Sequence, residues 1–310
     1  MIEDCKALVT QVAPEFLAHD SITTIGVGYE IYNGRPSNKL CLQYTLIPEA
    51  EEPVGLPASL KTRNNFEIAV QLLRRPKRNA LTKIDKELLR IRQQRLDLIA
   101  PGASISSLEG NPGTLGAIVF DRISKEPMML SCQHVLKENE SIFQPKRNVF
   151  DWDNLNLCGE TSRSYLGIYG DAAIAKIINR EFTTEMLGLN ISPRQIAIAQ
   201  LGDLVVKSGA NSGVTYGIVT RVGVVADLQY QGIVSQQISC FEITANPRKQ
   251  SPETPLSLDG DSGSLWMLND SDVAVGLHFA GECISEFGSS FALACNIDDV
   301  MQQLGVEFKS

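Results

Sequence analysis

A serine flanked by glycines is the residue of this chain best suited to nucleophilic chemistry. It lies in the run Gly260-Asp261-Ser262-Gly263-Ser264, which has apolar segments on both sides. A serine hydroxyl is a weak nucleophile until a positioned base removes its proton and N–H groups stabilise the resulting oxyanion. Glycines permit a tight turn that leaves the hydroxyl uncovered. We therefore expect Ser262 to be a nucleophile, and the N–H groups of Gly260 and Ser262 to be oxyanion donors.

A base for this serine has to be sought among three histidines, His19, His134 and His278. His134 directly follows an apolar segment that is typical of a strand. Asp171 begins another such segment, at an edge where a half-buried carboxylate can orient an imidazole and stabilise its charged form. Asp153 is an alternative acid, but no apolar strand follows it. We expect His134 to be the base and Asp171 to be its orienting acid.

The order His134, Asp171, Ser262 is that of chymotrypsin-like proteases and differs from the orders in subtilisins and α/β-hydrolases. Together with the Val-Gly-Leu segment after the serine, it makes residues 105–304 resemble the trypsin-like serine peptidase family. The resemblance implies two six-stranded antiparallel β-barrels with a cleft between them. It also implies an endopeptidase that acts on protein or peptide substrates and needs neither a metal nor an organic cofactor.

Further segments make nearly the whole chain similar to the intracellular, mostly prokaryotic branch of that family, which is related to plant narrow-leaf-type proteases. They are the segments 25–29, 113–116 and the Gly- and Thr-rich segment 207–217. The chain departs from this branch at Cys132-Gln133, where these relatives often have two asparagines. The departure leaves His134 in place.

The same family resemblance indicates where a substrate side chain would bind. Leu256 takes the position at the floor of the primary pocket, where trypsins have an aspartate, so cleavage after Lys or Arg is not expected. The pocket wall includes His278 and Gly281 in a GxHxxG pattern similar to that of proteases that cut after Gln or Glu. A histidine there would bind the polar side chain of the substrate. The alternative is that His278 only packs against neighbouring strands.

Residues 1–100 and 101–310 differ in their sequence patterns. Segment 2–18 has the apolar spacing of an amphipathic helix, and a second helix is predicted at 80–99. The sequence also predicts strands at 25–32, 40–46 and 66–72, a turn at Asn33-Gly34 and a short helix opening at 56–61. After residue 101, short β-rich runs alternate with turns as far as a closing helix at 297–304. We predict a mainly β protein in which a small α+β module precedes the two barrels.

Composition limits the classes of partner. With 310 residues, 43% of them hydrophobic and 21% charged, the chain can bury a sizeable core. A net charge of −8 argues against general attraction to nucleic acid or anionic lipid, and no apolar run reaches the ~20 residues of a membrane span. The start of the chain lacks the layout of a secretory signal, and its seven cysteines show no CxxC pair. We expect reduced thiols, no metal site and a cytoplasmic location.

Three alternatives stay open at this point. The chain could be a catalytically silent scaffold, although it has all three triad residue types. Segment 74–97 is rich in Lys and Arg, but no aromatic residues interleave with them, so a solvated helix face is favoured over nucleic-acid binding. Secreted trypsins pair the aspartate beside the catalytic serine, here Asp261, with a freshly cut N-terminus. Here that would need an activating protease to cut near 101–106. A regulatory or merely structural role for residues 1–100 is the alternative.

Overall fold

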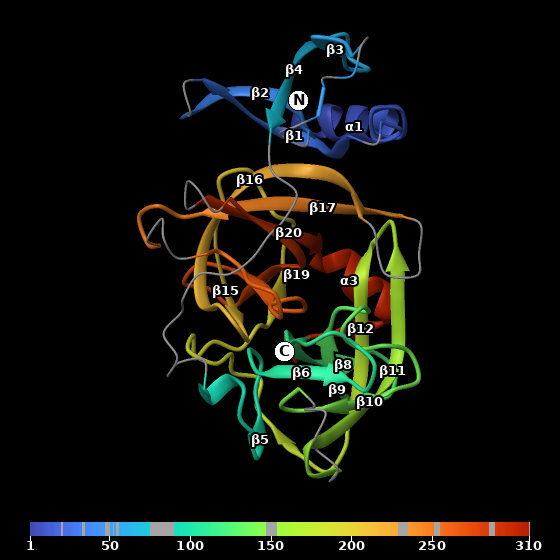
Figure 1. Cartoon of the computed structure of the whole chain (residues 1–310), viewed down its shortest axis with the longest axis vertical. Coiled ribbons are helices and arrows are strands. Elements are labelled where there is room, and N and C mark those ends of the chain that lie inside the picture. The colour runs from blue at the N-terminus through green and yellow to red at the C-terminus, as the bar shows by residue number, and fades with distance from the viewer. Residues whose placement is uncertain are drawn as a thin grey trace.

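The computed structural model contains two large sheets and a small N-terminal module (Figure 1). It describes residues 1–19, 21–32, 35–46, 50, 51, 53, 56–74, 90–146, 154–228, 235–250, 255–284 and 289–309. The predicted turn at Asn33-Gly34, the alternative acid Asp153 and most of the basic segment lie outside these residues. No helix within the described ranges is long and apolar enough to cross a bilayer.

The N-terminal module packs one helix against a small sheet. Its elements are α1 (Ile2–Leu17), β1 (Ile22–Tyr32), β2 (Arg35–Leu46), β3 (Ser59–Lys61) and β4 (Glu67–Arg74). The apolar face of α1 is buried, as its helical spacing predicts. The short helix predicted at 56–61 is wrong, because Ser59–Lys61 pairs with β4 as a strand. A three-residue strand of this kind depends on its partner rather than on its own propensity.

The first large sheet carries the segments around His134 and Asp171. Its order is β21-β8-β9-β12-β11-β10-β6-β7, and it curls into a half-barrel. The strands are β6 (Ser104–Ser107), β7 (Gly113–Thr114), β8 (Ala117–Asp121), β9 (Pro127–Ser131), β10 (Ser141–Phe143), β11 (Leu157–Gly167), β12 (Gly170–Ile177) and β21 (Val306–Glu307). A short 3₁₀ turn, Asn154–Asn156, leads into β11.

The second sheet contains a closed barrel of six strands and carries the Ser262 turn. The barrel closes because β16 pairs with β15 as well as with β17. The strands are β15 (Leu204–Gly209), β16 (Gly213–Leu228), β17 (Gln236–Ala245), β18 (Leu265–Leu268), β19 (Val273–Ile284) and β20 (Ser289–Asn296). The short β14 (Gln195–Ile196) adds to β19, and β5 (Leu98–Ile99) pairs with β13 (Glu181–Phe182) in a separate ribbon.

The N-terminal module continues the second sheet instead of standing apart from it. Strand β1 pairs antiparallel with the second half of β16, and Figure 1 shows the module stacked beyond β16 and β17. Gly26 permits this approach, because a Cβ there would lie 2.6 Å from Val224 Cγ2. Arg221 on β16 is buried in an ion pair with Glu242 at 3.0 Å and also donates to the Gln43 carbonyl of β2 at 2.6 Å.

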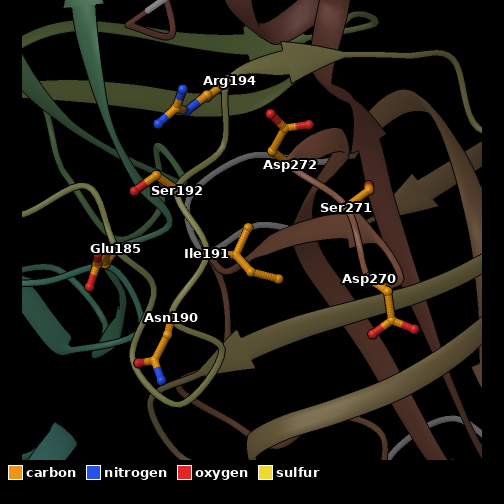
Figure 2. Close-up of a pocket in the computed structure, with 8 residues that line it drawn as sticks. All are labelled: Glu185, Asn190, Ile191, Ser192, Arg194, Asp270, Ser271 and Asp272. Atoms are coloured by element: carbon orange, nitrogen blue, oxygen red, sulfur yellow. The ribbon is translucent and has the colours of Figure 1, made fainter.

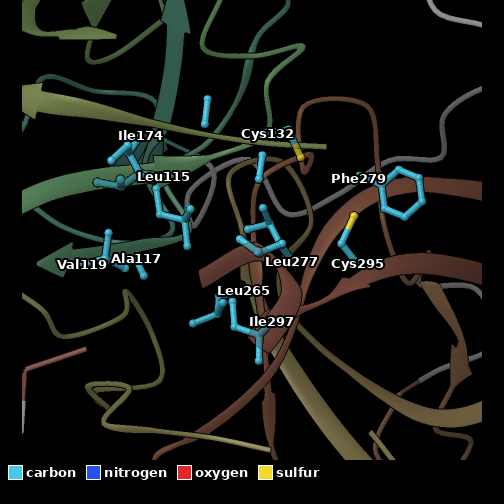
Figure 3. Packing of buried hydrophobic residues seen from close by; sticks show 14 of the residues in the cluster. Leu115, Ala117, Val119, Cys132, Ile174, Leu265, Leu277, Phe279, Cys295 and Ile297 are labelled. Atoms are coloured by element: carbon cyan, nitrogen blue, oxygen red, sulfur yellow. The ribbon is translucent and has the colours of Figure 1, made fainter. Parts of the chain in front are cut away.

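One apolar cluster joins the two barrels. Figure 3 shows Leu115, between β7 and β8, and Ile174 of β12 beside Leu265 and Leu277 of the second sheet. The closing helix α3 (Ile297–Leu304) adds Ile297 to this cluster, which confirms the helix predicted at 297–304. Burial of this shared core fixes the position of one barrel against the other, and therefore of the loops between them.

The fold prediction is confirmed as a chymotrypsin-like, mainly β double barrel, with the first barrel open as a half-barrel. The helix predicted at 80–99 is wrong at its C-terminal end. Residues 90–92 are helical, but the chain then turns and Leu98–Ile99 forms β5. The rest of that predicted helix lies outside the described residues.

Candidate active site

His134 and Asp171 form the first part of the site. Asp171 opens β12, and His134 lies in the turn after β9, which pairs with β12. Oδ2 of Asp171 lies 2.5 Å from Nδ1 of His134. Oδ1 accepts the backbone N–H groups of Gln133 at 2.7 Å and His134 at 3.3 Å. The fully buried carboxylate therefore places the imidazole proton on Nδ1 and leaves Nε2 as the basic nitrogen.

The turn that contains Ser262 meets the His134 loop at a shared acceptor. The carbonyl oxygen of His278 accepts the N–H of Gly263 at 2.7 Å and the Sγ–H of Cys132 at 3.2 Å. Thr114, in the first sheet, donates its N–H to the Ser262 carbonyl at 2.8 Å. The residue after Ser262 and a residue two before His134 thus bind one oxygen atom. This arrangement brings the two predicted side chains into adjoining loops at the junction of the barrels.

Ser262 itself is half-buried, and its Oγ lies 3.4 Å from the carbonyl oxygen of Phe279. Gly260 has φ +94°, which an L side chain rarely adopts, and this explains the need for glycine there. Among the described residues, no acceptor binds the N–H of Gly260 or that of Ser262, whereas the N–H groups of Asp261, Gly263 and Ser264 are all bonded. The two amides predicted as oxyanion donors are thus the two in this turn whose N–H groups have no acceptor among the described residues.

Asp261 points away from the nucleophile into the barrel. Its carboxylate forms a fully buried ion pair with Lys207 of β15 at 2.8 Å and also accepts the backbone N–H groups of Asn211, Ser212 and Leu258. Burial raises the pKa of Asp261, but the charge of Lys207 and side-chain hydrogen bonds with Lys207 and Ser212 outweigh burial and lower the pKa to about 2. Burial lowers the pKa of Lys207, and Asp261 partly offsets this. The carboxylate next to Ser262 in the sequence is thus paired with an internal lysine of the second barrel.

The predicted pocket residues lie behind the Ser262 turn. Leu256 and His278 are both buried, Leu256 in an apolar cluster with Trp266 and His278 edge-on to the same indole ring. A Cβ added to Gly281 would lie 2.5 Å from Ser257 Oγ and 3.6 Å from His278 Cε1. Ser257 and His278 therefore both lie close to Gly281, and Leu256 belongs to the neighbouring apolar core.

Comparison with solved structures identifies the architecture. Thermobifida fusca protease A matches with a TM-score of 0.50 and 16% identity, over 68% of this chain and 100% of that one. A Nocardiopsis protease matches with 0.51 and 14%, over 68% and 99%. A glutamic acid specific serine protease that uses a histidine triad in substrate binding matches with 0.52 and 17%, over 68% and 100%. The barrels have the chymotrypsin-like fold. No protein-family model matches the chain, and no curated protein is significantly similar to it.

Within this chymotrypsin-like fold, one cluster has the residue types of a metal site. The ligand atoms of Cys132, His134 and Asp171 lie within 4.8 Å of one another. However, His134 Nδ1 and Asp171 Oδ2 are 2.5 Å apart, closer than the ~3 Å between two ligands of one tetrahedral zinc ion. Their hydrogen bond occupies both ligand atoms, so the geometry favours a histidine–carboxylate pair over a metal site.

A hollow of about 620 Å³ opens elsewhere on the surface, between the segments 185–194 and 270–272. Figure 2 shows its lining, with Glu185 and Arg194 on one side and Asp270 and Asp272 on the other. None of the predicted catalytic, oxyanion or pocket residues lines it, so it is not the cleft that the triad would use.

Four residues near this site have no counterpart among the sequence predictions: Ser257, Lys207 as the partner of Asp261, and Gln93 and Asn211, of which Gln93 Nε2 donates to Asn211 Oδ1 at 2.6 Å. Ser257 directly follows the predicted pocket residue Leu256, so the sequence could have pointed to it. The other three carry no local signal, because each acts across a large sequence separation through a contact that only the folded chain creates.

Proposed function

We propose that the chain is a serine endopeptidase. Ser262 attacks the scissile carbonyl, Nε2 of His134 accepts its proton and later returns it to the leaving amine, and Asp171 stabilises the charged imidazole. The N–H groups of Gly260 and Ser262 receive the oxyanion. The observation that carries the proposal is the fixed Nδ1–carboxylate pair next to a turn with two amides free of acceptors among the described residues.

The buried Lys207–Asp261 pair supports activity without a cut at 101–106. In addition, Ser104–Ser107 is already committed to β6, so releasing a new N-terminus there would disrupt the first sheet. We place the chain in the intracellular prokaryotic branch, with protein or peptide substrates and no activating protease. The alternative of a silent scaffold is not favoured, because a scaffold does not need an open oxyanion site.

For the substrate residue before the cut, we propose Gln or Glu. His278, Ser257 and Gly281 lie together, and a histidine with a hydroxyl beside it can bind a carboxamide or carboxylate. Similarity to a solved glutamic acid specific protease that uses histidines in substrate binding agrees with this. Profiling with a peptide library should show cuts after Gln or Glu. A preference for Arg, Lys or bulky aromatic residues would refute this part of the proposal alone.

Labelling with a fluorophosphonate probe tests the proposed chemistry without knowledge of the substrate. Wild-type protein should be labelled at Ser262, as identified by mass spectrometry, and Ser262→Ala should not be labelled. The matched control is Ser271→Ala, a hydroxyl deletion in the 269–272 turn, which should label like wild type. Absence of labelling in folded wild-type protein would favour the scaffold alternative.

A further inference from the structure

The peptide bond between Asp259 and Gly260 decides whether the oxyanion site exists. In a planar trans peptide, the C=O and the N–H point in opposite directions. The Gly260 N–H therefore faces a substrate only while the Asp259 carbonyl faces the other way. Rotation of this one peptide would replace a donor with an acceptor and so destroy the site. Some part of the protein must hold the Asp259 carbonyl in place.

Asn211 supplies that hold. Its Nδ2–H donates to the Asp259 carbonyl, and a Cβ added to Gly260 would collide with the same Nδ2. Its backbone N–H donates to Asp261 Oδ1 at 2.9 Å, so its main chain is tied to the same turn. In the same turn, the Thr114 hydroxyl donates to the Gly260 carbonyl at 2.8 Å. Two consecutive carbonyls of the oxyanion turn are thus each held by a side-chain donor.

An asparagine side chain can do this only in one of its two amide orientations. Gln93 Nε2–H donates to Asn211 Oδ1 at 2.6 Å, which leaves Nδ2 directed at Asp259. A flipped amide would set N–H against N–H on one side and oxygen against oxygen on the other. The contact with Gln93 and the contact with Asp259 therefore agree on one orientation of the Asn211 amide.

Gln93 belongs to the segment before the barrels, and that segment is firmly attached. The neighbouring Arg92 is buried and donates to the Gly102 carbonyl at 3.2 Å, Ser208 Oγ at 2.5 Å and the Leu187 carbonyl at 2.7 Å. Gln144 accepts the N–H of Leu96 at 2.9 Å and donates to the Gln94 carbonyl at 2.8 Å. These bonds on either side of Gln93 fix its position against the barrels.

We propose that Asn211 is a positioning residue that holds the oxyanion site open, and that Gln93, from outside the barrels, sets the orientation of its amide. The inference deepens the proposed function and rests on it. Residues 1–100 thereby contribute to catalysis through a definite chain of contacts: Gln93 to Asn211, Asn211 to Asp259, and the Asp259–Gly260 peptide to the oxyanion.

Fluorophosphonate labelling rates and peptide turnover test this on the full-length chain. Asn211→Asp keeps the shape but sets a carboxylate against the Asp259 carbonyl, so the peptide should rotate. We expect labelling and kcat to fall by roughly 10²–10³-fold, as for loss of one oxyanion donor, with KM nearly unchanged. Asn211→Ala, which adds no charge, should also lower the labelling rate and kcat. An unchanged kcat in both variants, with melting temperatures like wild type, would overturn the proposal.

The role of Gln93 has a matched control next to it in the chain. Gln93→Glu puts an acceptor against Asn211 Oδ1 and should lower kcat about tenfold. Gln94→Glu makes the same change on an exposed side chain that forms no hydrogen bond with the described residues, and it should behave like wild type. Equal effects of the two variants would reduce the result to general electrostatics and overturn the role of Gln93.

Crystal structures separate failure of this inference from failure of the proposed function. If wild-type protein neither labels nor turns over peptides, the function fails, but the orientation of the Asp259–Gly260 peptide can still be compared. A rotated peptide in Asn211→Asp with a wild-type peptide in Gln94→Glu supports the positioning role. An unrotated peptide in Asn211→Asp overturns it whatever the activity.

Discussion

The carboxylate of Asp171 makes two different kinds of contact at this site. Its two carboxylate oxygens serve different partners: Oδ1 binds the backbone of the His134 turn, and Oδ2 binds the imidazole. The carboxylate is fully buried, so these bonds are not shared with bulk water. One side chain thus positions the loop and also selects the tautomer.

Asp171→Asn should preserve the fold and still impair catalysis. An amide offers one acceptor oxygen and one NH₂, so the NH₂ faces Nδ1 and favours the tautomer that has the proton on Nε2. We expect kcat to fall by roughly 10⁴-fold while the melting temperature changes little. Steady-state kinetics with a cleaved peptide measure this, and Asp270→Asn, an exposed acid-to-amide change, is the control. A loss of less than tenfold would contradict the assigned role.

At the scale of elements, a buried ion pair from β15 holds the Ser262 turn in place. Lys207 lies within β15, and its ammonium also donates to Ser212 Oγ at 2.7 Å, so the strand, the following loop and the turn share one buried charge pair. Removing one partner of such an ion pair leaves the other as an uncompensated charge in the core.

Lys207→Met should destabilise the protein by roughly 3–5 kcal/mol at pH 7. The pKa of Asp261 is lowered to about 2, so the stability from this carboxylate is complete above its ordinary pKa and is lost as pH falls through the folded pKa. The difference between wild type and variant should therefore narrow from pH 7 towards pH 2. Urea unfolding across this range measures it. Lys249→Met, which removes a partly exposed lysine 3.7 Å from Asp270, should show no comparable change. A constant difference would argue against this ion pair.

At the scale of the whole molecule, the N-terminal module is built into the second barrel. Val225 of β16 belongs to the core of the module, and Arg221 of the same strand bonds to Gln43, Thr24 and Thr45. The segment around Arg92 adds a second attachment near the oxyanion turn. The boundary at residue 100 is thus a change of sequence pattern that many contacts cross.

Residues 101–310 expressed alone should fail to form a stable, monomeric fold. Removing β1 exposes the edge of β16 and its apolar residues, and removing β1 and β2 together leaves the buried Arg221 without its acceptors Thr24, Gln43 and Thr45. Size-exclusion chromatography and thermal unfolding followed by circular dichroism, with the full chain as reference, test this. A monomeric fragment that unfolds cooperatively at the wild-type temperature would contradict it.

The sequence by itself determined the class of fold and indicated which residues could do chemistry. Ser262, His134 and Asp171 lie next to apolar strand segments in a recognisable order. Short apolar runs separated by turn residues are a local signal that can be read from the sequence alone. The helices at 2–18 and 297–304 were likewise predicted from local sequence patterns. Segments 56–61 and 98–99 were mispredicted as helical, because a strand of two or three residues depends on the strand it pairs with, β4 for Ser59–Lys61 and β13 for Leu98–Ile99, rather than on its own propensity.

Only the tertiary structure decided how the site is held. The pairing of β1 with β16, the burial of Lys207 against Asp261, and the contact of Gln93 with Asn211 each join segments that no sequence pattern links. The type of a charged or amide residue does not reveal whether its side chain is solvated or buried. Its role follows from the partner that folding brings to it and from the water that folding removes.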